Sequence, residues 1–174
     1  MTIDIRPIPA PEIESRVPAL TALLAEAIND GASLGFLPPL DVQDGRNYWI
    51  SLSQEIRSGA RVLLAAFSDE HLIGAAQLAL PQWPNARHRA EIQKVMVAGS
   101  MRGRGVGTML MSALHDVARR RGRHLLLLTA RHGDRSQTFY ASLGYRAVGV
   151  VPGYTLGPQG ERYDNVNLYH ELAD

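Results

Sequence analysis

At residues 95–108 the chain reads Val95-Met-Val-Ala-Gly-Ser-Met-Arg-Gly-Arg-Gly-Val-Gly-Thr108, and no other segment indicates its architecture so clearly. A β-branched stretch ends at Val97, a glycine-rich turn follows, and an amphipathic helix is expected to begin near Gly105. Such a turn leaves backbone N–H groups free at the helix N-terminus, where the helix dipole adds positive potential. It is therefore an anion site, most often for phosphate, to which Arg102 and Arg104 add positive charge.

Two other glycine loops do not fit this spacing. A dinucleotide-binding loop needs Gly-x-Gly-x-x-Gly and an acidic residue about 20 positions later. Here Gly103, Gly105 and Gly107 alternate, and the next strand ends without an acid. A nucleotide-triphosphate loop ends in Gly-Lys-Ser/Thr, but no lysine lies in this turn. A plain glycine turn without a ligand remains an alternative at this point.

The segments after the turn continue a pattern of alternating helix and strand. Apolar residues recur at three- and four-residue steps from Val106 to Val117, which predicts a helix that stops at Gly122. The apolar run His124–Thr129 is typical of a strand buried on both faces, and a short helix, Ser136–Leu143, follows it. Strand, turn, helix and strand therefore form a right-handed unit with two parallel strands.

Two motifs in this unit resemble one enzyme family. Arg102-x-x-Gly105-x-Gly107 resembles the acetyl-CoA pyrophosphate loop of the GNAT superfamily of N-acetyltransferases. Phe139-Tyr-x-x-x-Gly-Tyr145 resembles the helix that follows the second parallel strand in that family. The resemblance implies one domain over residues 1–174 with an α/β (α+β) fold. Its mixed, mostly antiparallel central sheet would contain one parallel pair, be splayed at the cofactor and be flanked by helices.

The same resemblance implies a reaction. Acetyl-CoA would be the cosubstrate, no metal would be needed, and the partner would be the primary amine of a small molecule. Further stretches, Asp30–Phe36, Arg89–Val97 and Val151–Tyr154, are similar to the tabtoxin-resistance branch of the family, which favours an amino-acid-like, toxin or antibiotic acceptor. A protein or peptide N-acetyltransferase and a non-catalytic acyl-CoA-binding module remain alternatives.

Two side chains are expected to carry the chemistry. A phenol has an unperturbed pKa near 10 and stays protonated at neutral pH, and the resemblance gives Tyr140 the role of assisting the departing thiol. Its alternative is an amphipathic residue with a buried ring. Glu91, in the strand before the glycine turn, is expected to take a proton from the amine directly or through water. Its alternative is a structural ion pair with Arg87, Arg89 or Lys94.

The resemblance also implies which residues contact each substrate. The strand end would pair its backbone with the pantetheine amides, as in strand addition. The expected cofactor-binding residues are Met96, Val97, Arg102, Gly103, Arg104, Gly105, Val106, Gly107, Thr108, Ser136 and Phe139. The expected acceptor-binding residues are Ser33, Phe36, Trp83, Asn85, Thr129 and Tyr154. The tabtoxin-resistance branch carries an acid at the position of Thr129, and many family members carry a cofactor-binding asparagine at that of Gly133. The identity of the base and of one cofactor-binding residue therefore stays undecided.

Composition narrows the function further. The chain has no cysteine, which excludes disulfides and an acyl-cysteine intermediate, and its histidines lack metal-ligand spacing. A formal net charge of +1 argues against a nucleic-acid partner. No apolar run is long enough to cross a membrane and no signal peptide is present, so a cytoplasmic monomer or homodimer is expected. Gly31-Ala-Ser-Leu-Gly35 matches a serine-hydrolase motif, but a helical segment precedes it, so a connector is expected.

The rest of the chain supplies the other strands and helices of the domain. Period-two and helical patterns with their turn residues mark each one. The predicted strands are Thr2–Pro7, Val62–Phe67, Leu72–Leu80, Arg146–Val151 and Asn165–Leu172, and the predicted helices are Pro18–Asn29 and Val42–Ser58.

Overall fold

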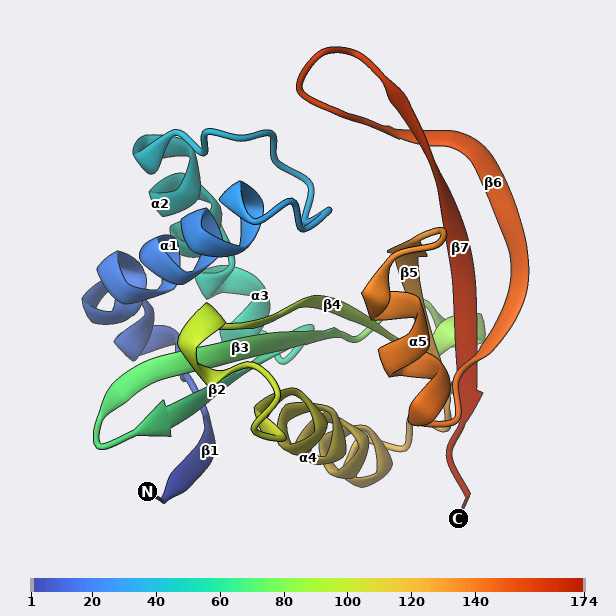
Figure 1. Ribbon diagram of the computed structural model, residues 1–174. Coiled ribbons are helices and arrows are strands. Elements are labelled where there is room, and N and C mark those ends of the chain that lie inside the picture. The colour runs from blue at the N-terminus through green and yellow to red at the C-terminus, as the bar shows by residue number, and fades with distance from the viewer. Residues whose placement is uncertain (1, 174) are drawn as a thin grey trace.

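A computed structural model describes residues 2–173 as one seven-stranded sheet between two layers of helices (Figure 1). The strand order is β1-β2-β3-β4-β5-β7-β6, and only the β4–β5 pair is parallel. The mixed sheet with one parallel pair that the sequence predicts is therefore confirmed. The strands are β1 (Ile3–Pro7), β2 (Arg61–Ser68), β3 (His71–Ala79), β4 (Arg89–Val97), β5 (Leu125–Arg131), β6 (Arg146–Leu156) and β7 (Arg162–Glu171).

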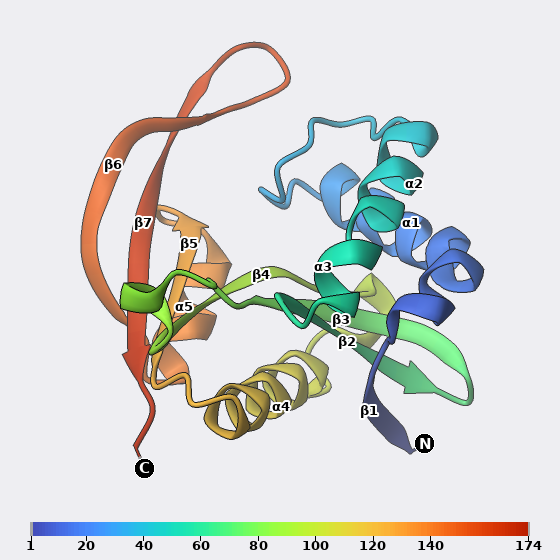
Figure 2. The same cartoon turned by 180° about the vertical axis from the view of Figure 1, so that it is seen from behind.

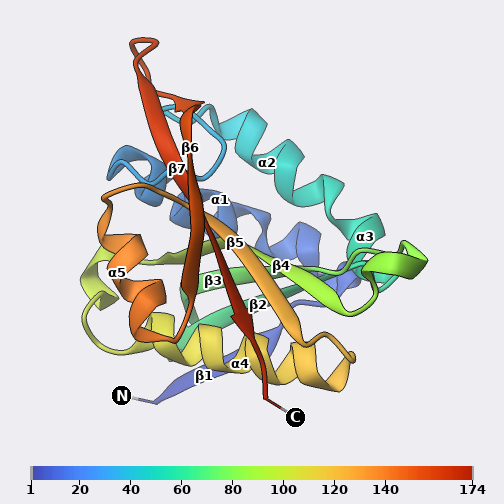
Figure 3. The same ribbon diagram turned by 90° about the vertical axis from the view of Figure 1, so that its right-hand side faces the viewer.

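The helices cover the two faces of the sheet unequally. Figure 2 shows α1, α2 and α3 on one face of β2–β4 and α4 on the opposite face, while α5 lies beside β5. Seen from the side in Figure 3, β6 and β7 form a long arm that rises past the first helices. The helices are α1 (Ile13–Asn29), α2 (Val42–Ser51), α3 (Ser53–Arg57), α4 (Val106–Arg120) and α5 (Arg135–Ser142), with short 3₁₀ turns at Ala10–Glu12, Pro84–Ala86 and Gly99–Met101. Within residues 2–173, no helix combines the length and the apolar character that crossing a membrane requires.

Each face of the sheet has its own hydrophobic core. Leu110 and Leu114 of α4 pack with Leu126 and Leu128 of β5 on one face. On the other face, α1 and α2 bury an apolar side that includes the fully buried Trp49. Burial of apolar surface, at about 25 cal/mol per Å², is the main force that holds both helix layers on the sheet.

The sheet opens between its two parallel strands. β4 and β5 pair over only three positions, from Arg89 with Leu125 to Glu91 with Leu127. β5 nevertheless pairs with β7 along its whole length, and β4 pairs with β3 as far as Val97. Beyond Glu91 the two strands therefore diverge, and the facing backbone edge of β4 has no strand partner. This confirms the predicted splay.

A bulge in β4 changes which face its side chains occupy. Lys94 has a positive φ of 51°, and the β3–β4 register shifts between Ala75 and Gln77, opposite this residue. Before the bulge, Ile92 packs toward α4; after it, Met96 packs toward α1. A bulge inserts one residue and so reverses the strand's alternation, which re-aims the side chains beside it.

Three predicted boundaries were wrong. α1 begins at Ile13 instead of Pro18, because Ile13 and Val17 are almost completely buried and continue its apolar side through the proline. The predicted helix Val42–Ser58 is split at Leu52, whose N–H bonds to the carbonyl three residues back. The strand predicted to end at Val151 continues to Leu156 through an irregular stretch in which the Gly153 N–H bonds to Asp164.

Candidate active site

The N-terminus of α4 is open to an anion. Its N-cap residue, Gly105, has a φ of 81°, and no side chain caps it. The N-termini of α2 and α5, in contrast, are capped by Asp41 and Asp134. A Cβ atom built on Gly103 or Gly105 would meet no atom of the described residues within 4 Å. The first N–H groups of α4 have no intrahelical acceptor, so this end of the helix fits a diphosphate.

The C-terminal end of α1 fixes the glycine loop in place. Glu26 accepts a hydrogen bond from the Gly99 N–H at 2.6 Å. Arg102 forms an ion pair with Asp30 at 2.8 Å and donates from Nε to the Val97 carbonyl at 3.1 Å. The Arg102 side chain is thus already engaged, whereas its expected role was to contact the anion. In the structure it holds the loop, which leaves the backbone N–H groups as the candidate donors to an anion.

The Phe139 ring of α5 lies against the start of α4. Ser136, Phe139 and Tyr140 lie on one side of α5, at spacings of three and four residues. A Cβ atom on Gly107 would come within 3.2 Å of Phe139 Cζ. Gly107 therefore allows close contact between the two helices, and this explains the glycine by packing as well as by the anion loop.

Tyr140 presents a free hydroxyl on a partly buried ring. Its ring lies 5.2 Å from that of Phe139 and 5.9 Å from that of Tyr145, measured between centroids. Among residues 2–173, no group forms a hydrogen bond with the Tyr140 hydroxyl. Burial raises the pKa of Tyr140 to about 12, so the phenol remains protonated at neutral pH. The group is a hydrogen-bond donor without a partner, as an acid in this position should be.

A cluster of aromatic side chains that the sequence did not reveal supports Tyr140. His115 Nε2 lies 2.9 Å from the Tyr145 hydroxyl, and the His115 ring stacks on that of His170 at 5.3 Å. Burial lowers the pKa of His115 to about 4 and raises the pKa of Tyr145, so a neutral imidazole and a protonated phenol share this hydrogen bond. His115 and His170 are far apart in the sequence and in no motif, so no local pattern could identify them.

Glu91 lies in a cleft at the point where β4 and β5 separate. The cleft has a volume of about 310 Å³ and includes Thr129, Asn167 and Val148 in its lining. The Thr129 hydroxyl donates to Asn167 Oδ1 at 3.0 Å. The structure thus brings together two residues, Glu91 and Thr129, that the sequence assigned to the same reaction.

The structural alternative for Glu91 was an ion pair. Within the described part of the chain, its carboxylate is not within ion-pair distance of any basic group. The three candidate partners from the sequence were Arg87, Arg89 and Lys94. A half-buried carboxylate without a cation in contact, in a cleft, is available to accept a proton.

The loop between α1 and α2, residues 31–40, contacts the end of β5. Arg131, at the end of β5, donates to the Gly31 carbonyl at 3.3 Å and stacks 4.2 Å above the Tyr163 ring. Phe36 packs edge-on against Tyr48 of α2, with centroids 5.5 Å apart. Ser33 lies within this loop and after a helix, so the structure confirms that its Gly-x-Ser-x-Gly motif is a connector.

Two predicted acceptor residues, Trp83 and Asn85, lie near the start of β5, whereas Ser33 and Phe36 belong to the loop at its other end. Trp83 is 75% exposed and, with Asn85, belongs to the turn whose Ala86 carbonyl accepts from Arg123, just before β5. The loop of residues 31–40 contacts the opposite end of β5, and the seven residues of that strand separate the two places by roughly 20 Å. Tyr154, an exposed residue on β6, lies on the arm that rises past the loop (Figure 3).

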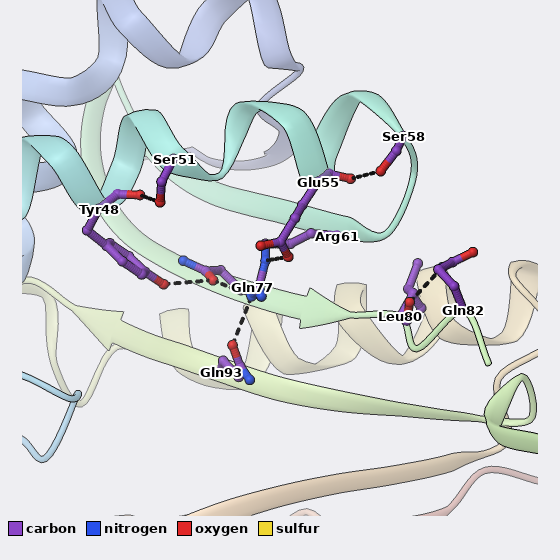
Figure 4. Close-up of polar contacts among 9 residues, drawn as sticks. All are labelled: Tyr48, Ser51, Glu55, Ser58, Arg61, Gln77, Leu80, Gln82 and Gln93. Atoms are coloured by element: carbon purple, nitrogen blue, oxygen red, sulfur yellow. Dashed lines mark hydrogen bonds and ion pairs between the residues drawn. The ribbon is translucent and has the colours of Figure 1, made fainter.

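A buried polar network connects α2 and α3 to the sheet. Arg61 donates to both Gln77 Oε1 and Gln93 Oε1 at 2.8 Å and forms an ion pair with Glu55, and the Tyr48 hydroxyl donates to Gln77 at 3.0 Å (Figure 4). Gln77 has no exposed surface. No sequence motif indicates this network, because its members come from α2, α3 and three different strands. Residues 2–173 contain no group of three or more His, Asp or Glu side chains placed to hold a metal ion.

Comparison with known protein families identifies the domain. A model described as the acetyltransferase (GNAT) family matches residues 21–145 of the chain. An uncharacterised protein of Mycobacterium leprae is 27% identical over 165 residues, which cover 87% of this chain and 44% of that protein. An L-methionine sulfoximine/L-methionine sulfone acetyltransferase of Pseudomonas aeruginosa is 24% identical over 139 residues, 78% of each chain. The chain thus spans less than half the length of the first relative.

Solved structures share the fold over nearly the whole chain. The ribosomal-protein-alanine N-acetyltransferase of Brucella melitensis has a TM-score of 0.78 and 25% identity, with 97% of this chain and 99% of that one covered. The protein yncA of Salmonella typhimurium, solved with its cofactor acetyl-CoA, has a TM-score of 0.77 and 19% identity, with 100% and 96% covered.

Proposed function

Because the chain belongs to the acetyltransferase (GNAT) family and is an acyltransferase, we propose that it transfers an acetyl group from acetyl-CoA to the primary amine of a small molecule by direct attack. The observation that carries this proposal is the free edge of β4. It runs from Glu91, where pairing with β5 ends, toward the uncapped N-terminus of α4. A base, a backbone edge and an anion site thus follow one another along one segment of the chain.

The cofactor would be held mainly by backbone groups. The diphosphate would accept hydrogen bonds from the N–H groups between Arg102 and Thr108, with the positive end of the α4 dipole behind them. Met96 has a buried side chain, so it and Val97 would contribute their peptide groups to pantetheine. Arg104 would add positive charge. The remaining proposed contacts are Gly103, Gly105, Val106, Gly107, Ser136 and Phe139.

Acetyl-CoA supplies an activated thioester carbonyl for attack by nitrogen. Glu91 would accept a proton from the attacking amine, directly or through a water molecule, as the new C–N bond forms. Backbone N–H groups near Val97 would donate to the carbonyl oxygen, where negative charge develops. Tyr140 would donate to the sulfur as the C–S bond breaks. The chain contains no cysteine, so an acyl-cysteine intermediate plays no part.

Two observations favour a small, amino-acid-like acceptor. The loop of residues 31–40 is held to β5 through Arg131 and to α2 through Phe36, so it would limit the size of an acceptor that binds beside it. The Pseudomonas aeruginosa relative is an acetyltransferase of two amino-acid derivatives. We propose Ser33, Phe36, Thr129 and Tyr154 as acceptor contacts.

A peptide N-terminus is the second candidate acceptor. The Brucella melitensis structure is that of an enzyme for ribosomal-protein alanine, and it matches this chain over almost its full length. A peptide needs an open groove between the loop of residues 31–40 and the β6–β7 arm. In Figure 1 this loop and the tip of the β6–β7 arm approach each other from opposite sides.

Acceptor-dependent release of coenzyme A tests the proposal. The purified chain is given acetyl-CoA with small primary amines, L-amino acids, or short peptides, and the acetylated products are identified by mass spectrometry. Turnover with small amines or amino acids is the expected result. Turnover with peptides alone favours the second candidate, and binding of acetyl-CoA without turnover identifies a binding module.

A further inference from the structure

Lys94 is the only lysine of this chain; all the other side chains among its 18 lysines and arginines are arginines. It lies at the bulge of β4, three residues after Glu91. In a regular strand two residues three apart face opposite sides, but the bulge brings Lys94 to the face that Glu91 occupies. Its charge interacts with that of Glu91. The bulge thus places an ammonium group on the face of β4 that carries Glu91, a residue of the cleft lining.

The ammonium group of Lys94 has no polar partner. Its Nζ lies 5.2 Å from the centre of the Tyr48 ring, and a Cβ on Gly35 would be 3.4 Å from it. Over residues 2–173, Nζ forms neither a hydrogen bond nor an ion pair. Lys94 is therefore held between α2 and the loop of residues 31–40 with its three N–H donors unused.

Within residues 2–173, no anion is in contact with Lys94. Burial lowers the pKa of its ammonium group, Arg61 lowers it further, and Glu91 only partly compensates. Tyr48 and the charged groups of Arg61 and Glu91 are the titratable neighbours that face it. A cation that is partly removed from water without an anion in contact is costly, so such a site favours binding of an anion.

Other unused donors surround the same loop. Arg131 Nε and Gln77 Nε2 are buried and have no hydrogen-bond partner. Arg131 contacts the loop at Gly31, and Lys94 lies against it at Gly35, four residues along the chain. Gln77 is linked to Lys94 through Tyr48, which bonds to one and lies under the other. The region thus contains an excess of N–H donors, which matches a ligand rich in acceptor oxygens.

We propose that Lys94 binds the carboxylate of the acceptor, so that the preferred acceptors are α-amino acids or analogues that carry an anionic group beside the amine. This inference rests on the proposed function. Glu91 and Lys94, on one face of β4, then complement the two ends of a zwitterion: the carboxylate of Glu91 faces the amine, and the ammonium of Lys94 faces the acid group. A lysine suits this role because its compact charge can approach a carboxylate from any direction, without the fixed fork of an arginine.

Paired substrates test this inference. The kcat/KM values for the twenty L-amino acids are compared with those for their amides, which keep the shape and the amine but lack the negative charge. Wild-type protein should prefer the best amino acid over its amide by at least about tenfold. Lys94→Gln should reduce that preference by about 10- to 100-fold, the range expected for a hydrogen bond between charged groups, and Lys94→Arg should retain part of it.

The control variant is Arg120→Gln, which removes one positive charge from the exposed last turn of α4. It should keep the wild-type ratio. A wild-type preference for amides, or an equal loss for both substrates in Lys94→Gln, would overturn the role of Lys94 while acetylation of small amines still stands. If peptides alone are acetylated, the proposed function fails and the inference falls with it.

The single lysine also allows a readout that does not depend on turnover. Protein labelled selectively with ¹³C,¹⁵N-lysine gives one lysine side-chain signal in NMR spectra. Addition of the amino acid should shift this signal and raise the pKa of Lys94, because the bound carboxylate supplies the missing counter-ion; the amide should do neither. Equal shifts with the two ligands would show that Lys94 only packs on Tyr48.

Discussion

The candidate site has two ends, one at α4 and one at the loop of residues 31–40, and they are built in different ways. The end at α4 is one continuous segment, residues 95–108, and its binding groups are backbone N–H groups with glycines that keep them open. The end at the loop of residues 31–40 gathers side chains from α2, β2, β3, β4 and β5. Under the proposed function, the local backbone motif would hold the constant part of the cofactor, and the dispersed side chains would select the acceptor.

The largest expected effect comes from closing the backbone site. Gly105→Asp places a Cβ and a negative charge in the open space before α4, and it forces a non-glycine residue to a φ of 81°. The strain is about 1–2 kcal/mol, and the repulsion of the diphosphate adds to it. We expect kcat/KM for acetyl-CoA to fall at least about 100-fold, measured by coenzyme A release.

Gly122→Asp is the matched control for this variant. Gly122 lies just past the other end of α4, also at positive φ (66°), with no atom of the described residues near its Cβ position. It should be similarly strained but bind acetyl-CoA as the wild type does. If both variants lose acetyl-CoA binding equally, the effect comes from the helix as a whole and the anion site is not at its N-terminus.

This contrast also explains what could be predicted from the sequence. The anion loop and the start of α4 follow from residues 95–108, because glycine spacing and helical periodicity are local signals, whereas the splay was implied by the family resemblance. The network around Gln77 and the pairing of His115 with Tyr145 depend on contacts between residues 29 and 30 positions apart. Trp83 and Asn85 were predicted by family likeness alone, and the structure places them at the far end of β5.

Tyr140 tests the chemistry beside the cofactor site. Tyr140→Phe removes the free hydroxyl and keeps the ring that packs on Phe139 and Tyr145. Because general acid assistance contributes about 10²–10⁴-fold, kcat should fall about 100-fold while the KM for acetyl-CoA changes little. Steady-state kinetics with chemistry shown to be rate-limiting provide the measurement. Full turnover by the variant at neutral pH would show that Tyr140 does not donate the proton.

A substitution of Glu91 tests the activation of the amine in the same way. Glu91→Gln keeps the shape of the cleft but removes the proton acceptor, and we expect kcat/KM for the amine to fall about 30-fold, less than a full general-base effect because water can substitute in part. The KM for acetyl-CoA should stay within about twofold. Unchanged turnover would mean that Glu91 is not the base and has only a structural role.

A second variant makes that prediction sharper. Thr129 lines the same cleft as Glu91, where the tabtoxin-resistance branch carries an acid. Adding Thr129→Asp to Glu91→Gln should recover part of the lost activity, about tenfold, because a carboxylate returns to the cleft. Thr129→Ala in the same background supplies no proton acceptor and should recover none. Equal recovery by both would mean that the hydrogen bond from Thr129 to Asn167, and not a base, limits the reaction.

The smallest expected effect concerns the packing behind Tyr140. Burial lowers the pKa of His115 to about 4, while a histidine in the unfolded chain titrates near 6.5. Between these values the unfolded state binds the extra proton, so the free energy of unfolding decreases as the pH falls from 6.5 toward 4. Since the ring is partly exposed, the change is on the order of 1–2 kcal/mol.

Urea unfolding at several pH values between 4.5 and 7 measures this dependence. His115→Gln should be less stable at pH 7, because it loses the contact with Tyr145, but its stability should fall less steeply with acid. His132→Gln, a substitution in an exposed turn, should keep the wild-type slope. The same slope in all three proteins would mean that His115 binds a proton in the folded state as readily as in the unfolded chain. His115 would then not be the neutral partner of Tyr145.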